Sequence, residues 1–299
     1  MKRRDFLATT LAAGAALGTK ELSGAKPREP FSLDYAPHFG MFRQNGGGEL
    51  LGELRFMAEQ GFRSLEDNGM RGRSVDEQER IASEMSRLGM RMGVFVAHTI
   101  YWNEPNLAGG DEARRDEFLN EIRSSVEVAK RVNAKWMTVV PGHVDLRLHA
   151  DYQTANVVES LKRAAEILEP HGLVIVLEPL NPRDHPGLFL KRIGQAYQIC
   201  KAVDSPSCKI LDDLYHQQIT EGNLIPNIDA AWDEIAYFQI GDNPGRDEPT
   251  TGEINFANVF AHIRDNGFDG ILGMEHGNSR PGREGELAVI AAYRSVDGR

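Results

Sequence analysis

The feature of this sequence that most constrains its fold is a regular alternation of short apolar runs with longer amphipathic segments. We expect strands at 31–35, 62–66, 92–97, 136–140, 174–177, 209–214, 235–240 and 270–274. We expect helices at 49–60, 75–88, 111–132, 152–169, 188–203, 219–232, 256–266 and 286–293. Eight strand–helix units with short connections predict an α/β fold, a single (β/α)8 TIM barrel.

Length and composition agree with one barrel domain. Residues 26–299 are many for one open sheet but ordinary for an α/β barrel. A content of 41% hydrophobic and 26% charged residues is enough for a sizeable core. The alternative, an open doubly wound sheet, requires a glycine-rich phosphate loop after an early strand. The triplet Gly46-Gly47-Gly48 lacks the required spacing, and the barrel is therefore favoured.

The first 25 residues carry the pattern of an export signal. Residues 2–7 read Lys-Arg-Arg-Asp-Phe-Leu, an apolar run covers 8–18, and small residues occupy 23–25. The run is too short for a bilayer span, which takes ~20 residues. We therefore predict a twin-arginine signal at 1–25, a periplasmic bacterial location, and no stable membrane anchor after cleavage. The alternative, a chance Arg pair on a buried helix, is disfavoured because the segment has no polar face.

The net charge and the cysteine content exclude two possibilities, a nucleic-acid-binding surface and a disulfide framework. A net charge of −10 argues against a nucleic-acid-binding surface, which would be basic. Cys200 and Cys208 are too few for a disulfide framework. They are either ordinary core residues or a pair that forms after export. The sequence leaves open whether the chain forms an oligomer.

Polar side chains stand at every predicted strand end, where TIM barrels carry their working residues. These residues are His38, Asn68, His98, His143, Glu178, Asp213, His216, Gln239, Glu275 and His276. The oxygen-bearing ends of four consecutive strands are Glu178, Asp213, Gln239 and Glu275. Four oxygen donors suit a hard divalent ion, Mg²⁺ or Mn²⁺, better than zinc. The alternative is a hydrogen-bonded polar plug in the barrel mouth.

A constrained turn follows the seventh predicted strand. Asn243-Pro244-Gly245 places a proline and a glycine where a tight turn needs them. Such a turn can direct Arg246 back across the barrel mouth, where its planar guanidinium suits a carboxylate or a pair of hydroxyls. The alternative is a surface arginine on a mobile loop.

Four segments resemble the hydroxypyruvate isomerase family. The resemblance covers roughly residue 31 to the C-terminus and is strongest from the fifth to the eighth predicted strand. The four segments are 177–181 (LEPLN), 213–216 (DLYH), 239–246 (QIGDNPGR) and 252–255 (GEIN). That family belongs to the xylose isomerase-like barrel superfamily, which also contains ketose 3-epimerases and endonuclease IV. The export signal and the looser match at 273–277 depart from the family pattern, and both bear on the substrate more than on the reaction type.

The resemblance implies a role for each site residue. The implied metal ligands are Glu178, Asp213, Gln239 and Glu275, with Mg²⁺ or Mn²⁺ as the cofactor. Glu178 and Glu275 would also move protons, and His216 and Arg246 would hold the substrate. The implied reaction is a 1,2-shift of a carbonyl through an enediolate, with hydroxypyruvate giving tartronate semialdehyde and Arg246 facing the substrate carboxylate.

Three alternatives to this activity remain at the level of sequence. A ketose 3-epimerase, or another sugar isomerase of the superfamily, would use the same residues on a neutral sugar. An endonuclease IV-like nuclease would need more metal-binding histidines and a basic groove, and this acidic chain lacks the groove. A non-catalytic exported sugar-binding barrel would bind its ligand without turnover.

Overall fold

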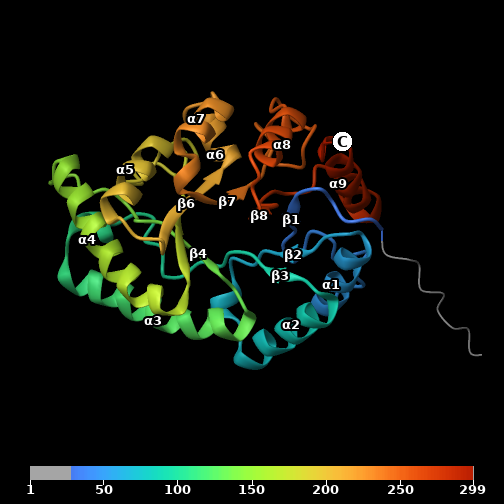
Figure 1. Ribbon diagram of the computed structural model, residues 1–299, viewed down its shortest axis with the longest axis horizontal. Coiled ribbons are helices and arrows are strands. Elements are labelled where there is room, and N and C mark those ends of the chain that lie inside the picture. Colours follow the sequence, from blue (N-terminus) through green and yellow to red (C-terminus); the bar gives the residue numbers. More distant parts are fainter. Residues whose placement is uncertain (1–27, 299) are drawn as a thin grey trace, which may run out of the picture.

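The computed structural model describes residues 28–298, which form the expected α/β TIM barrel (Figure 1). Its strands are β1 (Asp34–Ala36), β2 (Ser64–Leu65), β3 (Arg91–Met92), β4 (Trp136–Val139), β5 (Val174–Leu177), β6 (Cys208–Asp213), β7 (Ile235–Gln239) and β8 (Ile271–Gly273). One sheet has the order β1-β8-β7-β6-β5-β4, and β2 pairs with β3 in another. All pairings between these strands are parallel.

Isolated parallel bridges join the two sheets. His38 pairs with Glu66 just beyond the ends of β1 and β2, and Val96, which follows β3, pairs with Thr138 of β4. The strands therefore surround a common axis and leave few exposed edges. Because all of them run in the same direction, their carboxyl ends meet at one end of the barrel, where the predicted site residues stand.

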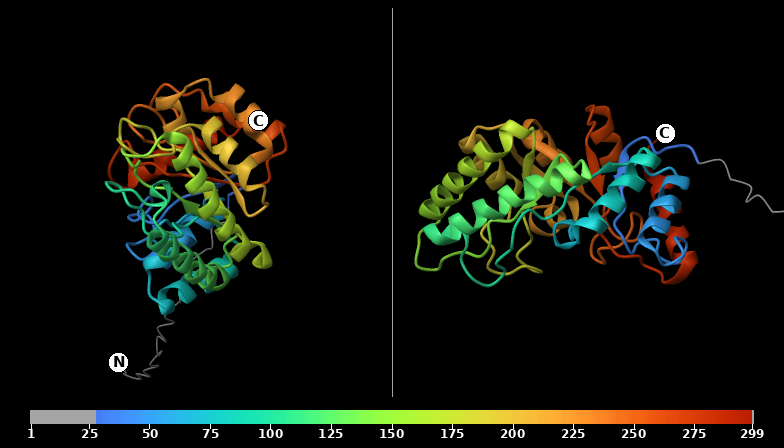
Figure 2. Two further views of the ribbon diagram at one scale, coloured as in Figure 1. Left: turned by 90° about the vertical axis from the view of Figure 1, so that its left-hand side faces the viewer. Right: turned by 90° about the horizontal axis from the view of Figure 1, so that it is seen from below.

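Helices cover the outside of the strands (Figure 1). The α-helices of the described chain are α1 (Leu50–Glu59), α2 (Val75–Leu88), α3 (Glu112–Val132), α4 (Ala150–Leu168), α5 (Ile193–Val203), α6 (Leu214–Thr220), α7 (Leu224–Ala231), α8 (Phe256–Asp265) and α9 (Gly282–Val296). Figure 2 shows the start of the described chain beside α9. Arg294 of α9 donates to the backbone oxygens of Glu29 and Gln60 (2.7 Å each), which closes the outer layer.

The expected helices exist, but the region after β6 differs in detail. Leu214 begins α6 rather than ending a strand, because the Asp213 side chain accepts a hydrogen bond from Tyr215 N and caps the helix. The expected helix 219–232 is two helices, separated where Gly222 and Asn223 adopt positive φ. Pro226 lies in the first turn of α7, where a proline is tolerated.

Two other boundaries also differ from the expectation. The expected helix 188–203 starts only at Ile193, because residues 178–192 form a long loop above β5. The last helix starts at Gly282 instead of 286. Cys200 and Cys208 are both buried with free thiols.

The barrel interior contains an apolar layer below a polar one. Inward-facing residues of the strands pack into one cluster, namely Ala36, Val94, Trp136, Val174, Val176, Leu211, Tyr237 and Ile271. Successive side chains on a strand alternate sides, so residues two positions later face inward again. Glu178, Asp213 and Gln239 stand two residues after Val176, Leu211 and Tyr237. The polar layer is therefore a direct consequence of strand periodicity.

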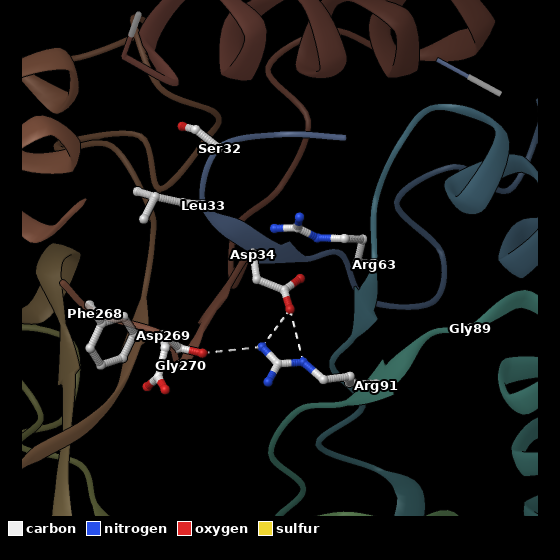
Figure 3. A pocket seen from close by; sticks show the side chains of 9 residues that line it. All are labelled: Ser32, Leu33, Asp34, Arg63, Gly89, Arg91, Phe268, Asp269 and Gly270. Atoms are coloured by element: carbon white, nitrogen blue, oxygen red, sulfur yellow. Dashed lines mark hydrogen bonds and ion pairs between the residues drawn. The ribbon is translucent and has the colours of Figure 1, made fainter. Parts of the chain in front are cut away.

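The opposite end of the barrel has a shallow cavity of about 300 Å³ near the strand starts (Figure 3). Asp34 and Arg91 form an ion pair in it, and Arg63 and Asp269 also line it. It lies at the amino ends of β1, β2, β3 and β8, away from the predicted site.

The predicted export signal at 1–25 lies outside the described residues. Within 28–298, no helix combines the length and the apolar character that crossing a bilayer requires.

Candidate active site

Four titratable side chains meet at the carboxyl ends of β5, β6 and β8. One ligand atom from each of Glu178, Asp213, His216 and Glu275 lies within 4.8 Å of the others. Glu178 directly follows β5, Asp213 ends β6, and Glu275 stands two residues beyond β8. His216 lies in the first turn of α6, which begins directly after β6. The structure thus brings together three of the predicted metal ligands and one predicted substrate-binding residue.

Gln239, the remaining predicted metal ligand, stands beside this group on β7. It is the register partner of Asp213 on β6, so both side chains point to the same side of the sheet. Its Nε2 donates to Glu66 Oε1 (2.8 Å), and its Oε1 is buried without a hydrogen-bond partner. A buried carbonyl oxygen of this kind needs a partner. Together with the three carboxylates it forms an all-oxygen donor set that fits Mg²⁺ or Mn²⁺.

The hydrogen bonds of Asn181 define the protonation of His216. Asn181 Oδ1 accepts from the backbone N–H groups of Arg183 (3.0 Å) and Asp184 (2.9 Å), which identifies the other amide atom as nitrogen. That nitrogen donates to His216 Nδ1 at 2.6 Å. Because Nδ1 accepts a hydrogen bond, the neutral ring carries its proton on Nε2.

The protonated Nε2 of His216 faces the carboxylates. It lies 3.4 Å from Asp213 Oδ2 and 3.7 Å from Glu178 Oε1 and forms a hydrogen bond with neither. Burial lowers the pKa of His216 to about 4, so the ring is neutral near pH 7. A nitrogen that carries a proton cannot ligate a metal. This tautomer suits donation to a substrate oxygen, although the ring lies within the potential ligand group.

The loop after β7 directs Arg246 into the site, as the sequence predicts. Asp242 Oδ1 and Oδ2 accept from the backbone N–H groups of Asn243, Gly252 and Ile254 at 2.8 to 3.1 Å. Arg246 Nη2 donates to Glu275 Oε2 (2.6 Å) and to Asp213 Oδ2 (3.1 Å). Its guanidinium carbon lies 4.8 Å from the centre of the Tyr215 ring. The alternative of a mobile surface arginine is therefore wrong.

Burial raises the pKa values of two carboxyl groups of the site, Glu178 and Glu275. Burial raises the pKa of Glu178 well above its ordinary value, and the nearby Glu275 and Asp213 raise it further. Burial raises the pKa of Glu275 to about 7, against the opposing effect of Arg246. Burial lowers the pKa of Arg246, but Asp213 and Glu275 outweigh this and raise it overall. A carboxyl group with a pKa near 7, as at Glu275, can both take and give protons.

Four histidines at predicted strand ends make hydrogen bonds outside the titratable group. His38 and His143 bond through Nδ1 to the backbone oxygens of Phe39 and Val144 (2.8 Å each). His98 Nε2 accepts from Val140 N (3.3 Å), and His276 Nε2 contacts Tyr293 Oη (2.8 Å). These bonds hold the loops around the mouth, and none of the four belongs to the titratable group.

Two asparagines near the strand ends contribute to the site without a role predicted from the sequence. Asn68 Nδ2 donates to Glu275 Oε1 (2.7 Å), and Asn181 holds His216 as described. Asn68 follows the second predicted strand, so its position was a usable signal. The partner of Asn181 is 35 residues away, and no local pattern indicates it.

Comparisons with known proteins identify a family and sequence relatives. A sequence profile of the xylose isomerase-like TIM barrel family matches residues 54–295. Hydroxypyruvate isomerase of Escherichia coli is 28% identical over 82% of this chain and 92% of its own length. 2-Oxo-tetronate isomerase of Cupriavidus necator is 31% identical over 60% of this chain and 69% of its own.

Solved structures share the fold. A protein described as AP endonuclease, family 2, from Brucella melitensis is 27% identical, with a TM-score of 0.76 over 87% of this chain and 99% of its own. A D-psicose 3-epimerase from Clostridium cellulolyticum has a TM-score of 0.69 over 88% of this chain and 91% of its own, at 18% identity. At that identity the epimerase shows a common fold only.

Proposed function

This chain belongs to the xylose isomerase-like TIM barrel family, and from that premise we propose that it is an isomerase of a small hydroxy-keto acid. The substrate we favour is hydroxypyruvate, with tartronate semialdehyde as the product. The observation that carries this proposal is the buried Glu178 and the partly buried Glu275, in one group with Asp213. Their raised pKa values suit them to exchange protons with a carbon acid near pH 7.

The reaction requires a proton to leave one carbon and return to its neighbour. For hydroxypyruvate, one glutamate removes a proton from C3, and the C–H electron pair forms the carbon–carbon double bond of an enediolate. A proton then returns to C2, while the hydroxyl proton on O3 moves to O2 and leaves an aldehyde at C3. We assign the carbon proton transfers to Glu178 and Glu275.

The remaining residues hold the substrate and a divalent ion. Glu178, Asp213, Gln239 and Glu275 would hold Mg²⁺ or Mn²⁺. Such an ion, when bound, acidifies the C–H bond beside a carbonyl and stabilises the enediolate charge. His216 donates from Nε2 to a substrate oxygen. Arg246 presents its guanidinium to the carboxylate, and the names of both sequence relatives given above specify carboxylic acids.

Deuterium exchange tests this proposal directly. Purified protein is stripped with EDTA, reloaded with Mn²⁺ or Mg²⁺, and incubated with hydroxypyruvate in D2O. We expect tartronate semialdehyde with deuterium at C2 by proton NMR, and no product from the stripped protein. Binding of hydroxypyruvate without exchange or product would favour the non-catalytic binding barrel. Exchange on neutral ketoses but not on hydroxypyruvate would favour an epimerase.

We also propose that residues 1–25 direct export by the twin-arginine route and that the barrel of 26–299 works in the periplasm. The twin-arginine route accepts folded cargo, and a metal-loaded barrel would not need to acquire its ion outside. The support for this proposal is the sequence pattern alone.

A further inference from the structure

We propose that Glu66, held by Tyr237, is a positioning residue that orients the side-chain amide of Gln239 and so presents Oε1 to the metal. This inference rests on the metal site of the proposed function. Glu66 is buried directly after β2. Its carboxylate contacts β7 through two donors, and it makes no other side-chain hydrogen bond among the described residues.

The two donors come from the same face of one strand. Tyr237 and Gln239 are two residues apart on β7, so both point into the barrel. Tyr237 Oη donates to Glu66 Oε2 (2.9 Å), and Gln239 Nε2 donates to Glu66 Oε1 (2.8 Å). Tyr237 Oη in turn accepts from Val94 N (3.4 Å). Both oxygens of Glu66 are thus engaged, and the carboxylate cannot rotate without breaking a bond.

Two glycines leave the space that this arrangement occupies. A Cβ on Gly273 of β8 would stand 1.7 Å from Glu66 Oε2 and 3.2 Å from Gln239 Cγ. A Cβ on Gly93 would stand 2.4 Å from Tyr237 Oη. Any larger residue at either position would displace a member of the network. The strands on both sides are therefore shaped around Glu66 and Tyr237.

The amide needs such an anchor because its two ends are nearly equal in size. A glutamine amide has an acceptor oxygen and a donor nitrogen, and only its partners decide which end points where. A carboxyl oxygen that accepts from Nε2 leaves Oε1 for a cation. Without Glu66, the amide could turn Nε2 toward the cation, where its hydrogens would exclude ligation. Mutation of a residue that orients a metal ligand typically lowers the metal affinity by about 10- to 100-fold.

The test measures metal binding by the stripped full-length protein. Glu66→Asp keeps the carboxyl group but withdraws it by one methylene, so it cannot reach both donors. We expect the Mn²⁺ affinity, measured by calorimetry, to fall by about 10-fold. We also expect the visible spectrum of Co²⁺-loaded protein to change, because one ligand is lost. A role in packing alone would lower the melting temperature and leave both readouts unchanged.

A matched control makes the same substitution at the other end of the barrel. Glu234→Asp shortens a buried glutamate that accepts from Lys209 Nζ (2.6 Å). Its Mn²⁺ affinity and Co²⁺ spectrum should equal those of the wild type. If Glu66→Asp fails to fold, Tyr237→Phe replaces it, since this change removes one anchor and leaves Gln239 and Glu66 in place. We expect from it a smaller loss of affinity and a shifted Co²⁺ spectrum.

The outcomes separate this inference from the proposed function. Mn²⁺ affinity and Co²⁺ spectra equal to wild type in the folded variants would overturn the positioning role while leaving the metal site intact. Failure of the wild-type protein to bind Mn²⁺, Mg²⁺ or Co²⁺ would instead overturn the metal site on which the inference rests.

Discussion

The side-chain amide of Asn181 donates a 2.6 Å hydrogen bond to Nδ1 of His216, and this contact decides what His216 can do. It joins the loop after β5 to the first turn of α6. Because Asn181 Oδ1 is occupied by two backbone N–H groups, its amide cannot turn over without losing both bonds. His216 is therefore fixed as a donor through Nε2.

Asn181→Asp should reverse the tautomer. The new carboxylate has no hydrogen to donate to Nδ1, so we expect the ring proton to move there and leave Nε2 as a lone pair. Long-range ¹H–¹⁵N NMR spectra of the histidine ring report the tautomer directly. Turnover should fall by about ten-fold or more, since a substrate oxygen would lose its donor. An unchanged tautomer with unchanged turnover would show that Asn181 does not control His216.

Replacing either Glu178 or Glu275 should remove activity without disturbing the fold. Glu178→Gln and Glu275→Gln keep the size of the side chain, but an amide cannot accept a proton from carbon and binds a cation more weakly. We expect each variant to lose at least about 100-fold in turnover with an unchanged circular dichroism spectrum. Metal content is measured alongside by atomic emission. A near-wild-type rate with metal bound in either variant would exclude a two-carboxylate mechanism.

Stability of the metal-free protein should depend on pH in a defined direction. The pKa of Glu275 rises from 4.5 to about 7 on folding, so between these values the folded chain binds a proton that the unfolded chain has released. Stability from this group is complete below pH 4.5 and is lost as the pH rises through 7. Glu178 and Glu66, whose pKa values burial also raises, add in the same direction.

Histidines oppose this trend only at lower pH. Burial lowers the pKa values of His98, His216 and His276 from 6.5 to about 4, which adds stability as the pH rises up to 6.5. We therefore expect the melting temperature in EDTA to fall from pH 6.5 to 8. With Mn²⁺ the decline should shrink or reverse, because metal binding favours the ionised carboxylates. A melting temperature that rises over this range in EDTA would contradict the assignment.

Much of the site could be predicted from the sequence because it depends on strand ends. Glu178, Asp213, Gln239 and Glu275 each follow an apolar run, and the barrel then brings the run ends to one place. The orientation of these groups depends on contacts between distant segments. Glu66 and Gln239 are 173 residues apart, and no periodicity indicates that they meet. The start of α6 differs from the prediction for a local reason, because Asp213 both ends β6 and caps the helix that follows.

Export is tested at the arginine pair. Replacing Arg3 and Arg4 with lysine keeps the positive charge of the segment but removes the pair that the twin-arginine route reads. We expect the variant to stay in the cytoplasm, whereas the wild type reaches the periplasm on cell fractionation. Equal export of both proteins would indicate another route or a different role for the segment.

Removing the charge of Arg246 tests whether the substrate is an acid or a neutral sugar. Arg246→Met keeps much of the side-chain stem and deletes the guanidinium. A charged hydrogen bond contributes roughly 1.5–3 kcal/mol, which is about ten- to a hundred-fold in rate or affinity. We expect kcat/KM for hydroxypyruvate to fall by at least that factor. The measurement compares hydroxypyruvate with a neutral ketose, and Mn²⁺ affinity is determined for the same protein.

The comparison between substrates is needed because Arg246 also contacts the carboxylates. Its Nη2 bonds to Glu275 and Asp213, and its charge lowers the pKa of Glu275. Its removal should therefore raise that pKa further and slow every substrate to some extent through a shift in the pH–rate profile. Only the additional loss on the acid measures contact with a substrate carboxylate. Equal losses on the acid and the ketose would mean that Arg246 acts through Glu275 alone, and a ketose epimerase would then become the better proposal.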